Sequence, residues 1–123
     1  MMNKELIISG SLMSLNEYIR ICRGNKYLAA KVKKEADQVV SLYIMEQLRG
    51  VKFDNAVRID FTWVCQNKRQ DPDNICFAKK FILDALTRCG VIKDDGWSEI
   101  YGFSDSFKVD KESPRIIVRI SEV

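Results

Sequence analysis

Apolar and polar residues recur along this chain with two different periods, and these periods predict its secondary structure. A strict period of two from Val57 to Cys65 predicts a strand with one packed face and one mostly wet face. From Tyr27 to Leu48, apolar residues recur at helical spacing, and Gly50 supplies a stop signal. This segment predicts an amphipathic helix about 33 Å long.

Shorter patterns predict the remaining elements. An apolar run from Glu5 to Ser9 predicts a short strand, whereas Leu12 to Asn25 has no clean period and is expected to form a long loop. A second helix is expected from Pro72 to Cys89, closed by a glycine. The last two strand-like segments, Glu99–Val109 and Arg115–Ser121, are expected to pair as an antiparallel hairpin.

The order of these elements is β-α-β-α-β-β, which predicts an α+β fold with two helices packed on a small mixed sheet. The chain has 123 residues. A chain of this size forms one domain, residues 1–123, and buries roughly two-thirds of its unfolded surface. No linker is needed.

The composition restricts the chemistry. The chain has no histidine, which excludes Ser-His-Asp and Cys-His catalysis and imidazole zinc sites. No cysteine pair has the C-x-x-C spacing of zinc ribbons or thioredoxin-like proteins; the cysteines are Cys22, Cys65, Cys76 and Cys89. The amino terminus lacks a signal pattern and no apolar run approaches about 18 residues, so a cytoplasmic protein with reduced thiols is expected.

The formal net charge of +3 is too small to indicate a polyanionic partner by itself. Its distribution is more informative, because the segment from Tyr18 to Lys34 holds six basic residues and no acid: Arg20, Arg23, Lys26, Lys31, Lys33 and Lys34. Two tyrosines lie among them. The segment is either a phosphate-facing patch or a solvated loop and helix face.

The stretch Gln70–Asn74 lies where a predicted strand has ended and a predicted helix begins. Pro72 restricts Asp71 to extended backbone, so the carboxylates of Asp71 and Asp73 can point to the same side. Two converging carboxylates repel each other unless a proton or a cation lies between them, and the usual cations for oxygen ligands are Mg²⁺ and Mn²⁺. The alternative is that Asp71 only caps the helix and Asp73 complements its dipole.

A third acid, Asp95, could complete this site only if the chain turns back. The predicted helix rises about 24 Å from Asp73 to Cys89. The six residues from Cys89 to Asp95 can return at most about 20 Å, and a side chain with a metal ion covers the remainder. The segment from Val91 to Asp95 must therefore run back beside the helix.

Three strings at this spacing resemble the RusA family of Holliday-junction resolvases: Lys68–Asn74, Asp84–Thr87 and Gly90–Asp95. The segment through Arg20, Arg23 and Gly24 is similar to the basic amino-terminal loop of that family. The similarity spans most of the chain and is specific from Lys68 to Asp95. It implies a Mg²⁺-dependent, homodimeric endonuclease that cuts four-way DNA junctions and is often encoded by phages or prophages.

The resemblance also implies roles for individual residues. The metal ligands would be Asp71, Asp73 and Asp95. The family uses a lysine in the following helix: counting back from Asp84 reaches Lys80, with Lys79 beside it, whereas counting forward from Asp73 reaches Phe77. We favour Lys80. The predicted DNA contacts are Arg20, Arg23, Lys26, Lys68 and Arg69.

These observations favour a structure-selective DNA endonuclease that uses Mg²⁺ or Mn²⁺, with branched DNA as its partner and neither a small-molecule cofactor nor a membrane. Carboxylates and a metal ion can hydrolyse a phosphodiester without histidine. One alternative is a non-catalytic nucleic-acid-binding protein whose acids are caps and turns. Another is a metal-dependent nuclease that acts on RNA or flap substrates.

Overall fold

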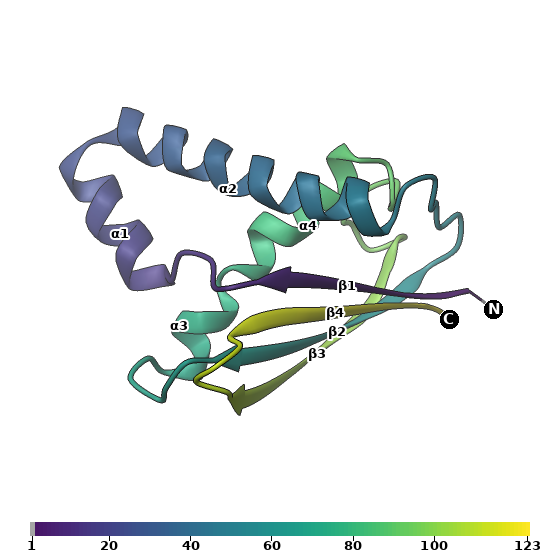
Figure 1. Ribbon diagram of the computed structural model, residues 1–123. Coiled ribbons are helices and arrows are strands. Elements are labelled where there is room, and N and C mark those ends of the chain that lie inside the picture. The colour runs from purple at the N-terminus through teal and green to yellow at the C-terminus, as the bar shows by residue number, and fades with distance from the viewer. Residues whose placement is uncertain (1) are drawn as a thin grey trace.

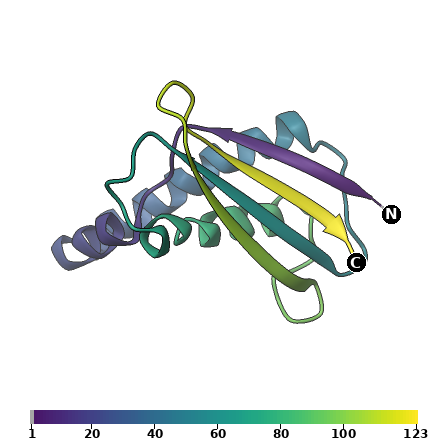
Figure 2. The same ribbon diagram turned by 90° about the horizontal axis from the view of Figure 1, so that it is seen from below.

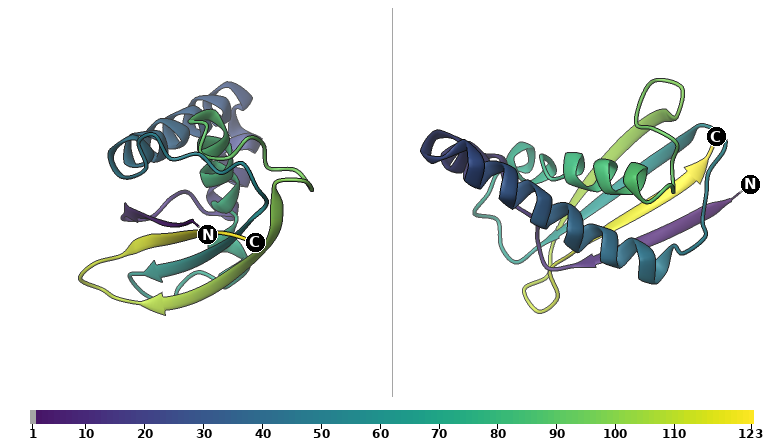
Figure 3. Two further views of the ribbon diagram at one scale, coloured as in Figure 1. Left: turned by 90° about the vertical axis from the view of Figure 1, so that its right-hand side faces the viewer. Right: turned by 90° about the horizontal axis from the view of Figure 1, so that it is seen from above.

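The computed structural model describes residues 2–123 as an α+β fold in which helices cover one face of a four-stranded mixed sheet (Figure 1). The strands are β1 (Asn3–Ser9), β2 (Val57–Cys65), β3 (Ile100–Val109) and β4 (Arg115–Glu122). The helices are α1 (Leu15–Gly24), α2 (Lys26–Gln47), α3 (Pro72–Cys76) and α4 (Lys79–Arg88). The predicted fold class is confirmed, and Figure 3 shows the helices on a single side of the sheet.

The strand order in the sheet is β1-β4-β2-β3 (Figure 2). β2 and β3 are parallel, whereas β4 is antiparallel to both β1 and β2. The predicted hairpin of the last two strands is therefore wrong, because β2 lies between them. β4 buries Ile116, Val118 and Ile120, which suits a central strand, whereas β3 is exposed over most of its length and suits an edge.

The core lies between the sheet and the helices. The alternation of β2 is confirmed, since its inward residues are at most 2% exposed: Val57, Ile59, Phe61 and Trp63. The rings of Phe61 and Trp63 stack with centroids 5.4 Å apart. α2 contributes Val40 and Ile44, and α4 contributes Phe81, Ile82, Ala85 and Leu86 to the same cluster. This cluster fixes the position of α4 above β2.

The predicted loop from Leu12 to Asn25 is wrong over most of its length, because α1 forms there. Its amino terminus has the Ser-x-x-Glu sequence of a capping motif, in which the Ser14 hydroxyl accepts from the Glu17 amide at 3.3 Å and donates to the Glu17 carboxylate at 3.2 Å. Asn25 then ends α1 and caps α2, its side chain accepting from the Tyr27 and Leu28 amides. α2 confirms the predicted long helix, and no helix within residues 2–123 is both long and apolar enough to cross a bilayer.

The second predicted helix is interrupted. α3 ends at Cys76, and the chain passes through Phe77 and Ala78 before α4 begins. The Phe77 ring packs against Tyr18 of α1 at 5.4 Å and against Phe81 at 5.6 Å, while Ala78 is buried. Tertiary packing at these residues therefore overrides the continuous helical period of the sequence.

Candidate active site

The Asp71-Pro72-Asp73 stretch begins α3 as the sequence predicts. Asp71 has extended backbone (φ −73°, ψ 151°) and occupies the N-cap position, followed by Pro72 in the first turn. Its carbonyl accepts from the amides of Asn74 and Ile75 at 3.0 and 3.1 Å. However, its carboxylate makes no capping hydrogen bond. The capping interpretation therefore accounts for the backbone of Asp71 and leaves its side chain available.

Asn74 anchors this stretch to α1. It is 9% exposed, and its side-chain oxygen accepts a hydrogen bond from the Asn16 amide at 2.8 Å. A second contact joins the Gln70 amide group to the Glu17 carboxylate at 3.4 Å. The first turn of α1 therefore positions both sides of the acidic motif, and α1 is part of the support of the site.

The chain turns back after α4, as the position of Asp95 requires. Gly90 adopts a left-handed conformation (φ +77°), and the Val91 amide donates to the Leu86 carbonyl at 3.0 Å. Val91 and Ile92 are buried, so the returning segment is held against the core. It brings the Asp95 carboxylate to 3.5 Å from the ammonium group of Lys80, in the first turn of α4.

Lys80 joins two acids. Its ammonium group lies 3.0 Å from Asp84 and 3.5 Å from Asp95. The hydrogen bond that Lys80 donates to Asp84 raises the pKa of Lys80 above its ordinary value of 10.5, with a smaller contribution from the Asp95 charge. Lys80 is therefore a cation throughout the neutral pH range. Its side chain is 56% exposed and can still reach a ligand.

Lys79 is held differently, although it is the next residue. Its ammonium group pairs with Asp105 of β3 at 2.7 Å and lies 5.2 Å and 4.8 Å from the ring centroids of Phe61 and Phe103. Only 19% of its side chain is exposed. Of the two lysines, Lys80 is therefore the one that faces the Asp95 turn.

Asp105 is a residue that the sequence interpretation missed. Besides Lys79, it accepts a hydrogen bond from the Trp63 indole at 2.8 Å, so it joins α4 to two strands. Its signal in the sequence is an acid at the inward register of β3, between Phe103 and Phe107. An acid in such an apolar alternation requires a partner, and that requirement could have identified it.

The three candidate ligands Asp71, Asp73 and Asp95 are not gathered into one set. Within residues 2–123, no group of three or more histidine, cysteine, aspartate or glutamate side chains is arranged to hold a metal ion. Asp71 and Asp73 are exposed at the start of α3, and Asp95 pairs with Lys80. Mg²⁺ is commonly bound by one or two carboxylates together with waters and substrate phosphates, so exposed oxygen donors at this position fit the ion.

The carboxylates of α3 and β3 do share a neighbour in Cys76. Burial is the largest effect that raises the pKa of the Cys76 thiol, and the negative charge of Asp105 adds to it, with a smaller contribution from Asp73. Lys79 partly opposes this shift. The Asp105 charge is already paired with Lys79 at 2.7 Å, so Cys76 marks the place where α3 and the Lys79–Asp105 pair come together.

The predicted DNA contacts fall into two exposed groups. Arg20 and Arg23 lie on α1 and Lys26 begins α2, at the elbow that projects beyond the sheet on the left of Figure 1. Lys68 and Arg69 lie on the loop before α3, at the same end of the molecule. Basic residues therefore lie on the loop that leads into the acidic motif and on the α1–α2 elbow at the same end of the molecule.

Comparison with known proteins gives one family. The family described as Endodeoxyribonuclease RusA matches residues 12–121, nearly the whole chain. The match begins just before α1 and ends within β4, so it includes all the residues of the candidate site. No curated protein matches the chain significantly.

Proposed function

The chain belongs to the RusA family of endodeoxyribonucleases, and from this premise we propose that it nicks four-way DNA junctions by metal-dependent phosphodiester hydrolysis. The ion pair of Lys80 and Asp95 is the observation that carries the assignment of the site. It joins the helix that follows the Asp71-Pro72-Asp73 motif to the Asp-Asp turn, two segments that are separate in the sequence. Family membership favours this nuclease over a non-catalytic binding protein.

In this proposal Asp71, Asp73 and Asp95 hold Mg²⁺ or Mn²⁺. The ion, when bound, would supply a Lewis acid at the phosphate and lower the pKa of a water. Lys80 remains protonated and would place a positive charge beside the reacting phosphate, or give a proton to the leaving oxygen. Asp84 also pairs with Lys80, at 3.0 Å, and would limit the directions that the lysine side chain can take.

The basic residues would bind DNA by its backbone. Arg20, Arg23 and Lys26 at the α1–α2 elbow, with Lys68 and Arg69 before α3, would contact phosphates and position the junction without reading its sequence. A homodimer would present two such sites related by a two-fold axis. That symmetry matches a four-way junction, in which two strands must be cut.

Removal of the metal tests this function directly. Wild-type protein should nick a synthetic four-way junction near its branch point with Mg²⁺ or Mn²⁺, and should not nick it in EDTA. Binding of the junction should persist in EDTA, because the basic residues do not depend on the metal. Linear duplex, flap DNA and RNA of matched length are the comparison substrates, and nicking is followed on denaturing gels.

Two outcomes would contradict the proposal. Tight junction binding without nicking in either metal would favour the non-catalytic nucleic-acid-binding protein. Faster cleavage of flap DNA or RNA than of the four-way junction would favour a nuclease with a different substrate.

Replacement of Lys80 tests the assignment of the helical lysine. Lys80→Ala is expected to lower the nicking rate by about a hundredfold, the lower range for the loss of a positioned proton donor. Because Lys80 is exposed, the melting temperature should change little. Lys111→Ala removes an exposed lysine from the β3–β4 turn and should leave the rate unchanged. Equal rates for the two variants would exclude Lys80 from the chemistry.

A further inference from the structure

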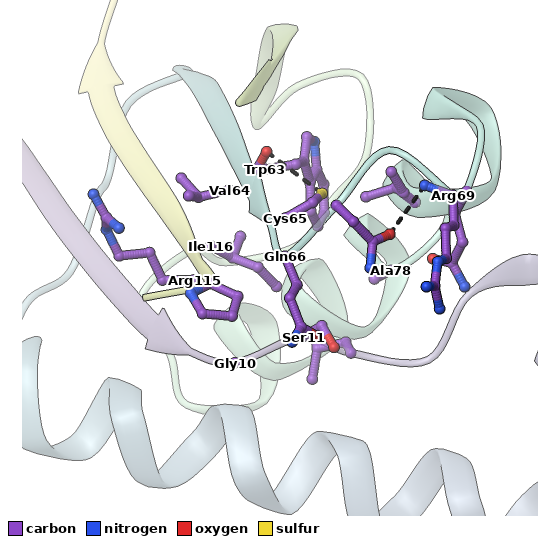
Figure 4. A pocket seen from close by; sticks show the side chains of 15 residues that line it. Gly10, Ser11, Trp63, Val64, Cys65, Gln66, Arg69, Ala78, Arg115 and Ile116 are labelled. Carbon is purple, nitrogen blue, oxygen red and sulfur yellow. Dashed lines mark hydrogen bonds between the residues drawn. The ribbon is translucent and has the colours of Figure 1, made fainter. Parts of the chain in front are cut away.

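A cavity of about 320 Å³ lies at the end of the sheet where β2 stops and β4 starts (Figure 4). Four segments that are distant in the sequence form its walls: the connection after β1, the end of β2 with the following loop, α3, and the start of β4. The loop of residues 66–70 is one of these walls, and it leads directly into Asp71. The cavity is therefore adjacent to the proposed nuclease site.

The lining combines apolar surface with polar groups. Trp63, Ile75 and Ile116 supply apolar surface, and Ser11, Gln66 and Arg69 supply polar atoms. None of its lining residues, in the part of the chain that the structure describes, is an aspartate or glutamate. Such a cavity suits a ligand with apolar faces, a hydrogen-bonding edge and a negative charge.

The available cation of this cavity is Arg69. Arg115, the other arginine of the lining, donates to Asp110 at 3.2 Å and to the Ser113 carbonyl at 2.7 Å, so its charge is already paired. The Arg69 backbone amide donates to the Asn67 side chain at 3.0 Å, which folds the loop locally. Within residues 2–123, the Arg69 guanidinium has no acidic partner within salt-bridge distance, and the Gln66 amide group likewise makes no hydrogen bond.

We propose that this cavity receives one nucleotide of the branched DNA, with its base unstacked inside and its phosphate on Arg69. This inference rests on the proposed function. The cavity has room for about ten water-sized groups, and a nucleobase has a similar number of non-hydrogen atoms. The Gln66 amide offers both a donor and an acceptor to a base edge. Unstacking costs least where base stacking is already interrupted, as at the branch point.

Because the cavity lies next to the acidic motif, a nucleotide bound in it would determine which phosphodiester is cut. Arg69 precedes Asp71 by two residues, so a phosphate on Arg69 would place the neighbouring phosphodiester beside the acidic motif. Insertion of the base would therefore fix which phosphodiester reaches Asp71 and Asp73. The cavity would act as a positioning site that selects the nick relative to the branch point.

Junctions that lack a single base test this inference. A set of four-way junctions carries one abasic nucleotide at successive positions around the branch point. Binding is measured in EDTA, and nicking is measured with Mg²⁺. Wild-type protein should lose about fivefold or more in affinity at one position, because stacking and edge contacts with one base are lost, and little at the others.

Two variants assign that loss to the cavity. Gln66→Ala removes the edge contact, and Ser11→Trp fills the cavity from an exposed residue, so both should flatten the dependence on position. Gln38→Ala, at an exposed position of α2, should retain the wild-type pattern. Circular dichroism and melting temperatures verify that each variant is folded.

Equal affinity of wild-type protein for every abasic junction would overturn the inference while leaving the proposed function intact. A position-dependent loss that persists in both cavity variants would also overturn it, because the base would then be bound elsewhere. Failure of wild-type protein to bind or nick the intact junction would instead contradict the proposed function, and the inference would fail with it.

Discussion

Asp73→Asn is expected to lower the rate of junction nicking by at least about a hundredfold. The substitution keeps the shape of the side chain and removes the negative charge that a divalent cation needs. Asp73 is exposed in the first turn of α3, so the fold should persist. Junction binding in EDTA should be unchanged or tighter, because one charge that repels DNA phosphates is lost. Single-turnover nicking rates, binding curves and melting temperatures measure these effects.

The matched control is Asp54→Asn. Asp54 has a side chain that is 80% exposed and lies in the connection between α2 and β2, away from the acidic motif. It should nick at the wild-type rate. A wild-type rate for Asp73→Asn would contradict the assignment of the metal site while leaving the endonuclease function standing.

Asp95→Asn should also lower the nicking rate, for two reasons that can be separated. It removes a proposed ligand, and it removes one partner of Lys80. The double variant with Asp95→Asn and Lys80→Ala separates these two effects. If Asp95 acts mainly through Lys80, the double variant should be no slower than Lys80→Ala alone.

Local periodicity was sufficient to predict the central elements of this fold. β2 has the bounds that its alternation predicts, and α2 begins and ends one residue before the predicted helix. In both elements the apolar face of the pattern is the face that packs, so burial and local propensity agree. The return of the chain after Gly90 was a condition for Asp95 to reach the acidic motif, and the structure brings Asp95 back as far as Lys80 in the first turn of α4.

The features that the sequence did not predict depend on tertiary contacts. α1 buries no residue completely, so its prediction depends on local signals, of which the capping motif of Ser14 and Glu17 is the clearest. β4 pairs with β1 and β2 and not with β3, which precedes it in the sequence. A turn signal between two strands cannot specify whether those strands are neighbours in the sheet. The alternation of β3 marks Asp105 as an acid that needs a partner, but only the structure shows that the partners are Lys79 and Trp63.

Arg88→Ala is expected to destabilise the fold by about 2 kcal/mol, because it leaves a buried carboxylate oxygen without its hydrogen-bond partner. Asp37 of α2 is 3% exposed, and one of its oxygens accepts from the Arg88 guanidinium of α4 at 3.0 Å. Its other oxygen has no partner within residues 2–123. The variant therefore leaves an unpaired carboxylate in the contact between the two helices. Urea unfolding, followed by the fluorescence of the buried Trp63, measures the change.

Most of this cost should come from the carboxylate that is left behind. The Arg88 side chain is 58% exposed, so the arginine itself loses little burial when it is removed. Asp37→Leu in the Arg88→Ala background removes the stranded charge, and it should recover much of the lost stability. Arg49→Ala, at an exposed position after α2, should change stability by less than about 0.5 kcal/mol. A similarly small effect for Arg88→Ala would show that solvent, and not the arginine, stabilises the Asp37 charge.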